Sequence, residues 1–321
     1  MTGKICGTGS YVPSHYLDNN DLSRMVETSD EWIRERTGIV TRHIKQEDTT
    51  VSMAVKASQK ALANAGMEPE QIDLILVSTI SSNVILPCTA CMVQKEIGAV
   101  NAVCFDVNAA CTGFLAAYNT AQAYINGGLA ENVLVIGAEA LSDMVDWEDR
   151  STCILFGDGA GAVVIKAVQG SVFSTCMHSD GSKGDALTCS HIYPEKKKTF
   201  SGMMESSYIR MNGQEVFKFA VKQVPAVILE LLEKEGMVTA DIRYFLLHQA
   251  NGRIIEAVAR RLGVSLDRFP MNVDAYGNTS SASIPILLDE WNRKGELKAG
   301  DRIVLSGFGA GLTWGAALME W

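Results

Sequence analysis

Residues 61–80 read ALANAGMEPEQIDLILVSTI, and residues 231–250 read LLEKEGMVTADIRYFLLHQA. Each stretch has the pattern of a helix end, a Gly-Met pair, a polar turn and an apolar strand. Two pairs of residues match at the same spacing of 170 positions: Gly66 with Gly236, and Ile72 with Ile242. An internal repeat of this kind predicts two similar α/β halves, which we place at residues 1–170 and 171–321.

A second repeat ends each half. Residues 156–165 read FGDGAGAVVI and residues 307–318 read GFGAGLTWGAAL, so in both halves a glycine-rich turn leads into a strand. Elsewhere, helical patterns alternate with short strands rich in Val, Ile and Leu, which is typical of sheets covered by helices on both faces. The helical patterns cover residues 51–66, 113–127, 216–234, 251–262 and 283–293. These features predict the α/β fold class.

The composition sets limits on function. The chain has 321 residues, of which 47% are hydrophobic, and this supplies a large core. Its net charge of −9 argues against broad binding to nucleic acid or to an anionic membrane, although a local basic patch remains possible. We find no apolar run long enough to span a membrane and no signal peptide, so we expect a cytoplasmic protein with reduced cysteines. Residues 178–207 lack periodicity and are predicted as an irregular excursion.

Cys111 is the most prominent candidate for chemistry. It lies in a small-residue elbow between a strand-like run, residues 103–107, and an apolar segment with a helical pattern that begins at Gly113. The N-terminus of a helix favours the thiolate form of a cysteine, and the thiolate is the nucleophile. The alternative is a small buried hydrophobic residue, as most unpaired cysteines are. The elbow favours a nucleophile.

Two further segments can supply polar side chains to the same pocket. His248 follows a predicted strand, as Cys111 does, and ligand sites in α/β folds lie at the carboxyl ends of strands. Asn278 follows Tyr276-Gly277. From the residues alone, His248 could equally be a core histidine, and the pattern around Asn278 favours a turn residue or a helix N-cap. Cysteine, histidine and asparagine together suggest covalent acyl chemistry.

Other motifs point away from competing chemistry. Cys88 and Cys91 match a C-x-x-C pattern, but no second pair accompanies them, so we expect no metal site. The glycine-rich stretches of the second repeat lead into strands instead of helices, which does not fit a dinucleotide-binding fingerprint. A G-x-S-x-G motif is absent, which disfavours a serine hydrolase.

Several motifs together resemble those of the β-ketoacyl-[acyl-carrier-protein] synthase III family, the initiating condensing enzymes of the thiolase superfamily. The resemblance covers essentially the whole chain. Its motifs are GTGSYVPSHYLDN at 7–19, ETSDEWIRERTGI at 27–39, DVNAACTGF at 106–114, DRSTCILFGDGAGA at 149–162, HQANGRI at 248–254, GNTSSASIP at 277–285 and GFGAGLTWG at 307–315. The resemblance implies thiolase-like duplicated halves in a five-layered αβαβα architecture, and a homodimer.

It also implies an activity. In this family a cysteine takes an acyl group from acyl-CoA, here acetyl-CoA or another short-chain acyl-CoA, and malonyl-acyl-carrier protein then loses CO₂. The resulting enolate attacks the acyl-enzyme. The resemblance implies Cys111 as the nucleophile and His248 and Asn278 as hydrogen-bond donors to the malonyl thioester oxygen. The other oxyanion would be held by the backbone N–H of Cys111 and one in the Gly309-Ala310 loop. No cofactor is implied, since acyl-CoA is a substrate.

The substrate contacts are carried over in the same way. The adenine of CoA would lie between Trp32 and Arg150, with Arg36 and Thr28 near the phosphates. Gln214 stands where an asparagine commonly contacts the pantetheine arm. Leu86 lies in a stretch that in relatives reaches across the dimer to the partner's acyl pocket. The malonyl-carrier protein, which is acidic, would dock on a basic patch that consists of Lys218, Arg253, Arg260 and Arg261.

Alternatives remain open at the level of sequence. One is a related condensing enzyme of secondary metabolism that uses CoA-bound malonate, and another is a catalytically inactive scaffold that only binds a carrier protein. A hydroxymethylglutaryl-CoA synthase would need a glutamate base near the nucleophile, and no matching motif surrounds Glu139 or Glu148. The length of the primer acyl chain stays undetermined.

Overall fold

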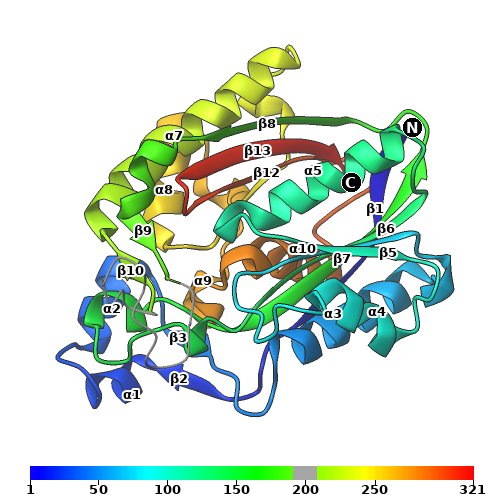
Figure 1. Ribbon diagram of the computed structural model, residues 1–321. Helices are drawn as coiled ribbons and strands as arrows, with labels where there is room; N and C mark the ends of the chain where they lie inside the picture. The colour runs from blue at the N-terminus through cyan, green and yellow to red at the C-terminus, as the bar shows by residue number, and fades with distance from the viewer. Residues whose placement is uncertain (191–207) are drawn as a thin grey trace.

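The computed structural model describes residues 1–190 and 208–321. Two main sheets lie face to face across a layer of helices (Figure 1). The first sheet has the order β1 (Thr2–Tyr11), β7 (Gly159–Val168), β6 (Asn132–Glu139), β4 (Leu74–Ser78) and β5 (Val103–Val107). The second has the order β11 (Tyr244–Leu247), β12 (Arg302–Gly309), β13 (Thr313–Glu320) and β8 (Phe173–Ser179). Each sheet therefore draws its strands from one half of the chain.

The two repeated stretches adopt the same local structure. Helix α3 (Thr50–Ala65) ends at Gly66 and helix α7 (Gly213–Lys234) ends just before Gly236, and both glycines have a left-handed φ, of 62° and 64°. A residue with a side chain resists that conformation, so glycine stops the helix. A short 3₁₀ turn then leads to β4 in one half and to β11 in the other. The predicted helix–turn–strand repeat is confirmed.

Helices cover both faces of each sheet, and separate apolar clusters mark the layers. Helices α3 and α4 (Thr89–Ile97) pack on the outer face of the first sheet. Helices α7 and α8 (Gly252–Leu262) pack on the outer face of the second. Helices α5 (Gly113–Asn126) and α10 (Ser283–Arg293) share one cluster with strands of both sheets and so form the central layer. The five-layered αβαβα architecture is confirmed.

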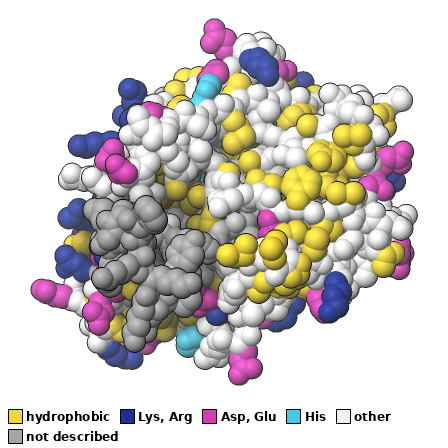
Figure 2. All heavy atoms as spheres, viewed as in Figure 1, with side chains coloured by type: hydrophobic (Ala, Val, Ile, Leu, Met, Phe, Trp, Pro, Cys, Tyr) yellow, Lys and Arg dark blue, Asp and Glu magenta, His cyan; other side chains and the backbone are white. Residues whose placement is uncertain are grey.

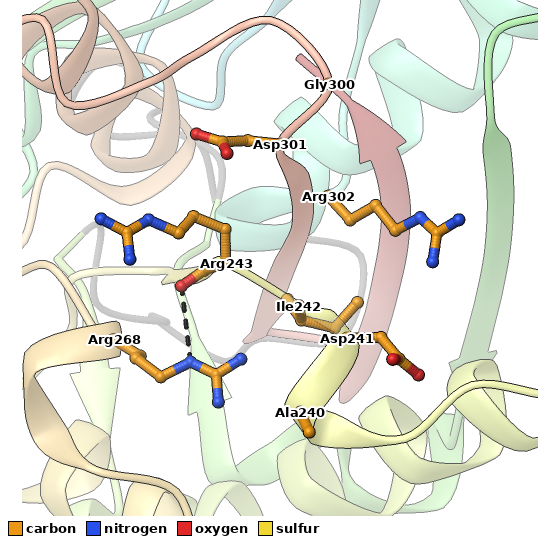
Figure 3. A pocket seen from close by; sticks show the side chains of 8 residues that line it. All are labelled: Ala240, Asp241, Ile242, Arg243, Arg268, Gly300, Asp301 and Arg302. Atoms are coloured by element: carbon orange, nitrogen blue, oxygen red, sulfur yellow. Dashed lines mark hydrogen bonds between the residues drawn. The ribbon is translucent and has the colours of Figure 1, made fainter.

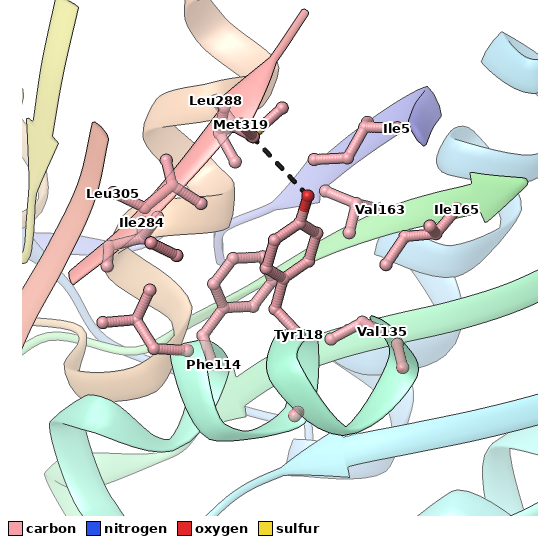
Figure 4. Packing of buried hydrophobic residues seen from close by; sticks show 14 of the residues in the cluster. Ile5, Phe114, Tyr118, Val135, Val163, Ile165, Ile284, Leu288, Leu305 and Met319 are labelled. Atoms are coloured by element: carbon pink, nitrogen blue, oxygen red, sulfur yellow. Dashed lines mark hydrogen bonds between the residues drawn. The ribbon is translucent and has the colours of Figure 1, made fainter. Parts of the chain in front are cut away.

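The central layer holds the largest buried aromatic residues of this core. Phe114 and Tyr118 project from α5 toward apolar side chains of both sheets, among them Val163 from β7 and Leu305 from β12 (Figure 4). Both aromatic side chains are fully buried, and burial of one such side chain stabilises a fold by about 1.5–3 kcal/mol. This packing fixes α5, and with it the residues that precede the helix.

Shorter elements form a cap beside the sheets. They are β2 (Tyr16–Asp18), α1 (Asn19–Ser23), α2 (Asp30–Thr37), β3 (Thr41–His43), α6 (Arg150–Cys153), β9 (Leu187–Thr188), β10 (Arg210–Met211) and α9 (Val273–Tyr276). Arg42 is fully buried, and its Nη2 donates to Asn19 Oδ1 at 2.8 Å and to the Ile154 carbonyl at 2.9 Å. The guanidinium thus ties β3 to α1 and to the end of α6.

The predicted irregular excursion is partly wrong. Residues 178–179 complete β8, a 3₁₀ turn covers Gly181–Ala186, and β9 pairs with β10. Residues 191–207 of the excursion lie outside the described residues. In the part of the chain that the structure describes, no helix is long and apolar enough to cross a membrane.

Candidate active site

Cys111 lies in the connection between β5 and α5. The strand and the helix occupy the predicted positions, and a 3₁₀ turn, Ala110–Thr112, joins the helix directly. Ala110 has a φ of 46°, a left-handed conformation that residues other than glycine rarely adopt. Such backbone strain is found mainly where a structure must hold a functional side chain in place. Cys111 itself is only 8% exposed.

Two glycines of β12 bring the second half of the chain against Cys111. A Cβ atom on Gly309 would lie 2.9 Å from the Cβ and 3.0 Å from the backbone N of Cys111, so a side chain at this position would clash. At Gly307 an added Cβ would lie 3.5 Å from the Cys111 carbonyl oxygen and 3.6 Å from the Cβ of His248. Strand β12 therefore lies directly beside both residues.

His248 follows β11 and is 2% exposed. Its Nδ1 lies 2.6 Å from the Oγ of Ser283, and that hydroxyl also accepts the backbone N–H of Gln249 at 3.3 Å. If the Ser283 hydroxyl donates its proton to Nδ1, the imidazole proton resides on Nε2. Ser283, the first residue of α10, was not predicted from the sequence as part of this site.

Asn278 is held by its backbone and by its side chain. Its N–H donates to the Leu155 carbonyl at 2.8 Å, and its carbonyl accepts from Gly157 N at 3.0 Å. Its side-chain Oδ1 accepts the N–H of Ser280 at 2.9 Å. Because this hydrogen bond holds Oδ1 against the turn, the Nδ2 group is the end of the amide that can donate into the cavity that Asn278 lines.

Cys111, His248 and Asn278 line one cavity of about 520 Å³. The two halves thus contribute to a single site, as the repeat suggested. Apolar walls come from residues such as Phe156 and Phe308. The other predicted site residues that line this cavity are Trp32, Arg36, Gln214, Lys218, Arg253 and Gly309.

The remaining predicted residues lie elsewhere. Arg150 stands over the ring of Trp32, with 4.9 Å between its Cζ and the ring centroid, at the edge of the cavity. Thr28 precedes α2, and its buried hydroxyl has no hydrogen-bond partner in the described chain. Ala310 follows Gly309 in the turn after β12. Leu86 is 82% exposed and does not line its own chain's cavity.

The four residues of the predicted basic patch lie at different distances from the cavity. Lys218 and Arg253 line the cavity, whereas Arg260 and Arg261 do not. These two arginines lie in the last turn of α8, and a rise of about 1.5 Å per residue places Arg260 roughly 10 Å along the helix from Arg253. Arg260 and Arg261 stay predicted docking residues, because a surface that binds a protein extends beyond the residues that line a cavity.

The thiol of Cys111 is affected by burial as well as by the helix end. Burial raises the pKa of this thiol to about 12, although the nearby Ser280 hydroxyl acts in the opposite direction. Burial and the helix end therefore act on the pKa of this thiol in opposite directions.

His248 is expected to stay neutral across the physiological range, because burial lowers its pKa to about 3. The imidazole of the unfolded chain has an ordinary pKa of 6.5, so between pH 6.5 and 3 it binds a proton that the buried imidazole of the folded protein does not bind. His248 therefore contributes stability that is complete above pH 6.5 and is lost as the pH falls toward 3. NMR titration of its imidazole, assigned with a His248→Ala variant, should show no proton uptake between pH 5 and 8; a midpoint near 6.5 would contradict this environment.

A second cavity lies at the opposite ends of β11 and β12 (Figure 3). Three arginines line it: Arg243, Arg268 and Arg302. Their guanidinium groups point in different directions, and Asp241 and Asp301 line the same cavity (Figure 3). The arrangement lacks the convergent donors that recognition of an anion requires. We therefore assign the chemistry to the Cys111 cavity.

Comparisons with known proteins agree with this geometry. Two family profiles match, "3-oxoacyl-[acyl-carrier-protein (ACP)] synthase III" at residues 105–181 and its C-terminal counterpart at 232–321. A β-ketoacyl-[acyl-carrier-protein] synthase III of Clostridium acetobutylicum is 48% identical over 319 residues, which are 99% of this chain and 98% of that protein.

Solved structures give the same result. The 3-oxoacyl-[acyl-carrier-protein] synthase III of Aquifex aeolicus has a TM-score of 0.92 and 45% identity over 99% of this chain and all of that one. The priming β-ketosynthase of the R1128 polyketide pathway has a TM-score of 0.92 and 36% identity over 99% of this chain and 96% of that one. This chain belongs to the β-ketoacyl-[acyl-carrier-protein] synthase III family.

Proposed function

We propose that this protein initiates type II fatty acid synthesis by a decarboxylative Claisen condensation. Its substrates are a short-chain acyl-CoA and malonyl-acyl-carrier protein, and its products are a β-ketoacyl-carrier protein, CoA and CO₂. One observation carries the proposal: Cys111, His248 and Asn278 meet in a single cavity of a chain that belongs to this family. The scaffold alternative is disfavoured because all three side chains are present and converge.

In the first half-reaction the sulfur of Cys111 attacks the thioester carbonyl of acyl-CoA. The new bond joins this sulfur to the acyl carbon, the bond to the CoA sulfur breaks, and the proton of the Cys111 thiol passes to the CoA sulfur. Backbone N–H groups of Cys111 and of the Gly309-Ala310 loop would stabilise the tetrahedral oxyanion. The tight approach of Gly309 to Cys111 supports this arrangement.

In the second half-reaction the malonyl thioester loses CO₂, and negative charge develops on its carbonyl oxygen. Nε2–H of His248 and Nδ2–H of Asn278 are proposed to donate hydrogen bonds to this oxygen. Both donors are neutral and held in place before the reaction, so they stabilise the enolate without reorganising. The enolate carbon then bonds to the acyl carbon on Cys111 while the bond from that carbon to the Cys111 sulfur breaks, and the released thiolate takes a proton from water.

The mouth of the cavity fits CoA. We propose that adenine inserts between Trp32 and Arg150, with Arg36 and Thr28 near the phosphates. In the substrate-free protein the guanidinium of Arg150 already covers the Trp32 ring, and its Nη1 donates to the Glu27 carbonyl at 2.7 Å. Adenine would therefore displace Arg150 from this stacked position. Gln214 lines the cavity at the start of α7, where it can contact the pantetheine arm.

We also propose a homodimer. Strand β5 is an edge strand that pairs only with β4 within the described chain, and its Val103 is 61% exposed. Hydrophobic side chains gather on the face of the molecule around β5 and α5 (Figure 2). Leu86 projects from the loop before α4 and would reach the partner's acyl pocket. The cytoplasm is the proposed location, since thiols such as Cys111 and Cys153 are free.

The runner-up is a condensing enzyme of secondary metabolism that uses CoA-bound malonate. The 36% identity to a polyketide priming synthase is the observation in its favour. An enzyme that uses CoA-bound malonate needs no basic docking surface, whereas one that uses malonyl-carrier protein does. Rates with a panel of acyl-CoAs, measured with malonyl-carrier protein and with malonyl-CoA, separate the two.

Arg253→Glu is expected to raise the KM for malonyl-carrier protein by roughly tenfold, most strongly at low salt, while acyl transfer from acyl-CoA to Cys111 hardly changes. Arg253 is exposed at the mouth, and a net charge of −9 otherwise repels an acidic partner. Arg302→Glu, which changes the same charge at the opposite end of β12, is the matched control. Unchanged carrier-protein kinetics in Arg253→Glu would remove the docking patch and favour the runner-up.

A further inference from the structure

Glu139, the last residue of β6, is fully buried and makes no ion pair with any residue that the structure describes. Its Oε2 accepts from the Ser81 hydroxyl at 2.7 Å and from the backbone N–H of Ile80 at 3.1 Å. Its Oε1 lies 2.8 Å from the hydroxyl of Ser281. A carboxyl group at this depth is costly unless every partner is satisfied. None of the chemistry above uses it, and it does not line the Cys111 cavity.

Ser281 connects the two halves of the chain at this point. Its Oγ lies 2.8 Å from Glu139 and 3.0 Å from the Ser78 carbonyl at the end of β4, yet a hydroxyl has a single proton to donate. Both contacts are satisfied together when Glu139 carries a proton and donates it to Ser281, which then donates to Ser78. Burial favours this protonated form, because it raises the pKa of Glu139 even though the Ser81 hydrogen bond opposes the change.

The same turn orients the amide of Asn278. Ser280 has a left-handed φ of 48°, and the N–H of this residue holds Oδ1 of Asn278 at 2.9 Å. Ser280 is the chain neighbour of Ser281. The hydrogen bonds that hold Ser281 therefore also fix the strained backbone of Ser280 and the direction of its N–H. Gly137 of β6 approaches the Ser281 carbonyl so closely that a Cβ there would overlap it. Strand β6 thus supports this turn at two points.

We propose that Glu139 is a positioning residue for decarboxylation. It anchors Ser281 to the ends of β4 and β6, and through Ser280 it keeps Oδ1 of Asn278 turned away and Nδ2 turned into the cavity. Glu139 touches neither substrate nor the reacting atoms, and the inference rests on the proposed role of Asn278. The contact between Glu139 and Ser281, which lie more than a hundred residues apart in the sequence, thus sets the orientation of the Asn278 amide.

Three variants test the anchor: Glu139→Ala, Glu139→Gln and Ser281→Ala. Glu139→Ala and Ser281→Ala should slow CO₂ release from malonyl-carrier protein by roughly ten- to a hundredfold, the scale of a misplaced catalytic group, while acylation of Cys111 falls much less. Glu139→Gln should recover most of the loss, because its amide N–H₂ can donate to Ser281 as the protonated acid does. Equal losses in both half-reactions for Ser281→Ala, or no recovery in Glu139→Gln relative to Glu139→Ala, would overturn the proposal.

A double-mutant cycle shows whether the effect passes through Asn278. If it does, Glu139→Ala combined with Asn278→Ala decarboxylates no more slowly than Asn278→Ala alone, and additive losses would overturn the inference. Asp289→Asn is the matched control, since this buried carboxylate accepts from the hydroxyls of Thr8 and Ser10 away from the cavity. It should leave the ratio of the two half-reactions unchanged. A wild-type protein that releases no CO₂ would refute the proposed function itself, which is a separate outcome.

Discussion

Replacing Cys111 with serine is expected to abolish formation of the acyl-enzyme. A serine hydroxyl needs a strong base, and the only imidazole among the described lining residues, His248, has a pKa of about 3. A thiol is more acidic and intrinsically more nucleophilic than an alcohol, so Cys111 depends less on such a base. Intact-protein mass spectrometry after incubation with acetyl-CoA should show an acyl mass on the wild type and none on Cys111→Ser.

Cys176→Ser is the matched control for this experiment. Cys176 lies on β8, and burial raises the pKa of its thiol as it does that of Cys111, but it does not line the cavity. The control should acquire the acyl group at the wild-type rate. If Cys111→Ser acquired it equally fast, the assignment of the nucleophile would fail.

His248→Ala and Asn278→Ala should each slow decarboxylation of malonyl-carrier protein by roughly a hundredfold or more, the cost of losing one oxyanion donor. Acylation of Cys111 should continue at a measurable rate in both variants, because the roles proposed for both side chains lie in the second half-reaction. CO₂ release and acyl mass, followed separately, give the two rates. His178→Ala, which removes a histidine paired with Glu230 outside the cavity, is the control. Equal losses in both half-reactions, or a loss in neither, would contradict the assigned roles.

The sequence was sufficient to predict the repeat and the elbow because both depend on local patterns. The left-handed glycines, Gly66 and Gly236, and the switch from strand to helix around Cys111 are encoded within short stretches. Hydrophobic runs of Val, Ile and Leu likewise indicated strands that are buried on both faces. The five layers followed from the family resemblance, and the apolar clusters confirm them.

The parts that escaped prediction depend on contacts between distant residues. Ser283 pairs with His248 across 35 positions and Ser281 with Glu139 across 142, and no short pattern encodes either pairing. Burial of the Cys111 thiol, which raises its pKa, likewise depends on a distant contact, because Gly309 packs against Cys111.

The central claim is that one cavity carries out both half-reactions on CoA and carrier-protein substrates. It is tested most directly by mass spectrometry of the carrier protein after a single turnover with acetyl-CoA and malonyl-carrier protein. The account predicts conversion of the malonyl group to an acetoacetyl group, with release of CO₂, and no conversion with Cys111→Ser. A carrier protein that keeps its malonyl group, while malonyl-CoA is consumed under the same conditions, would contradict it.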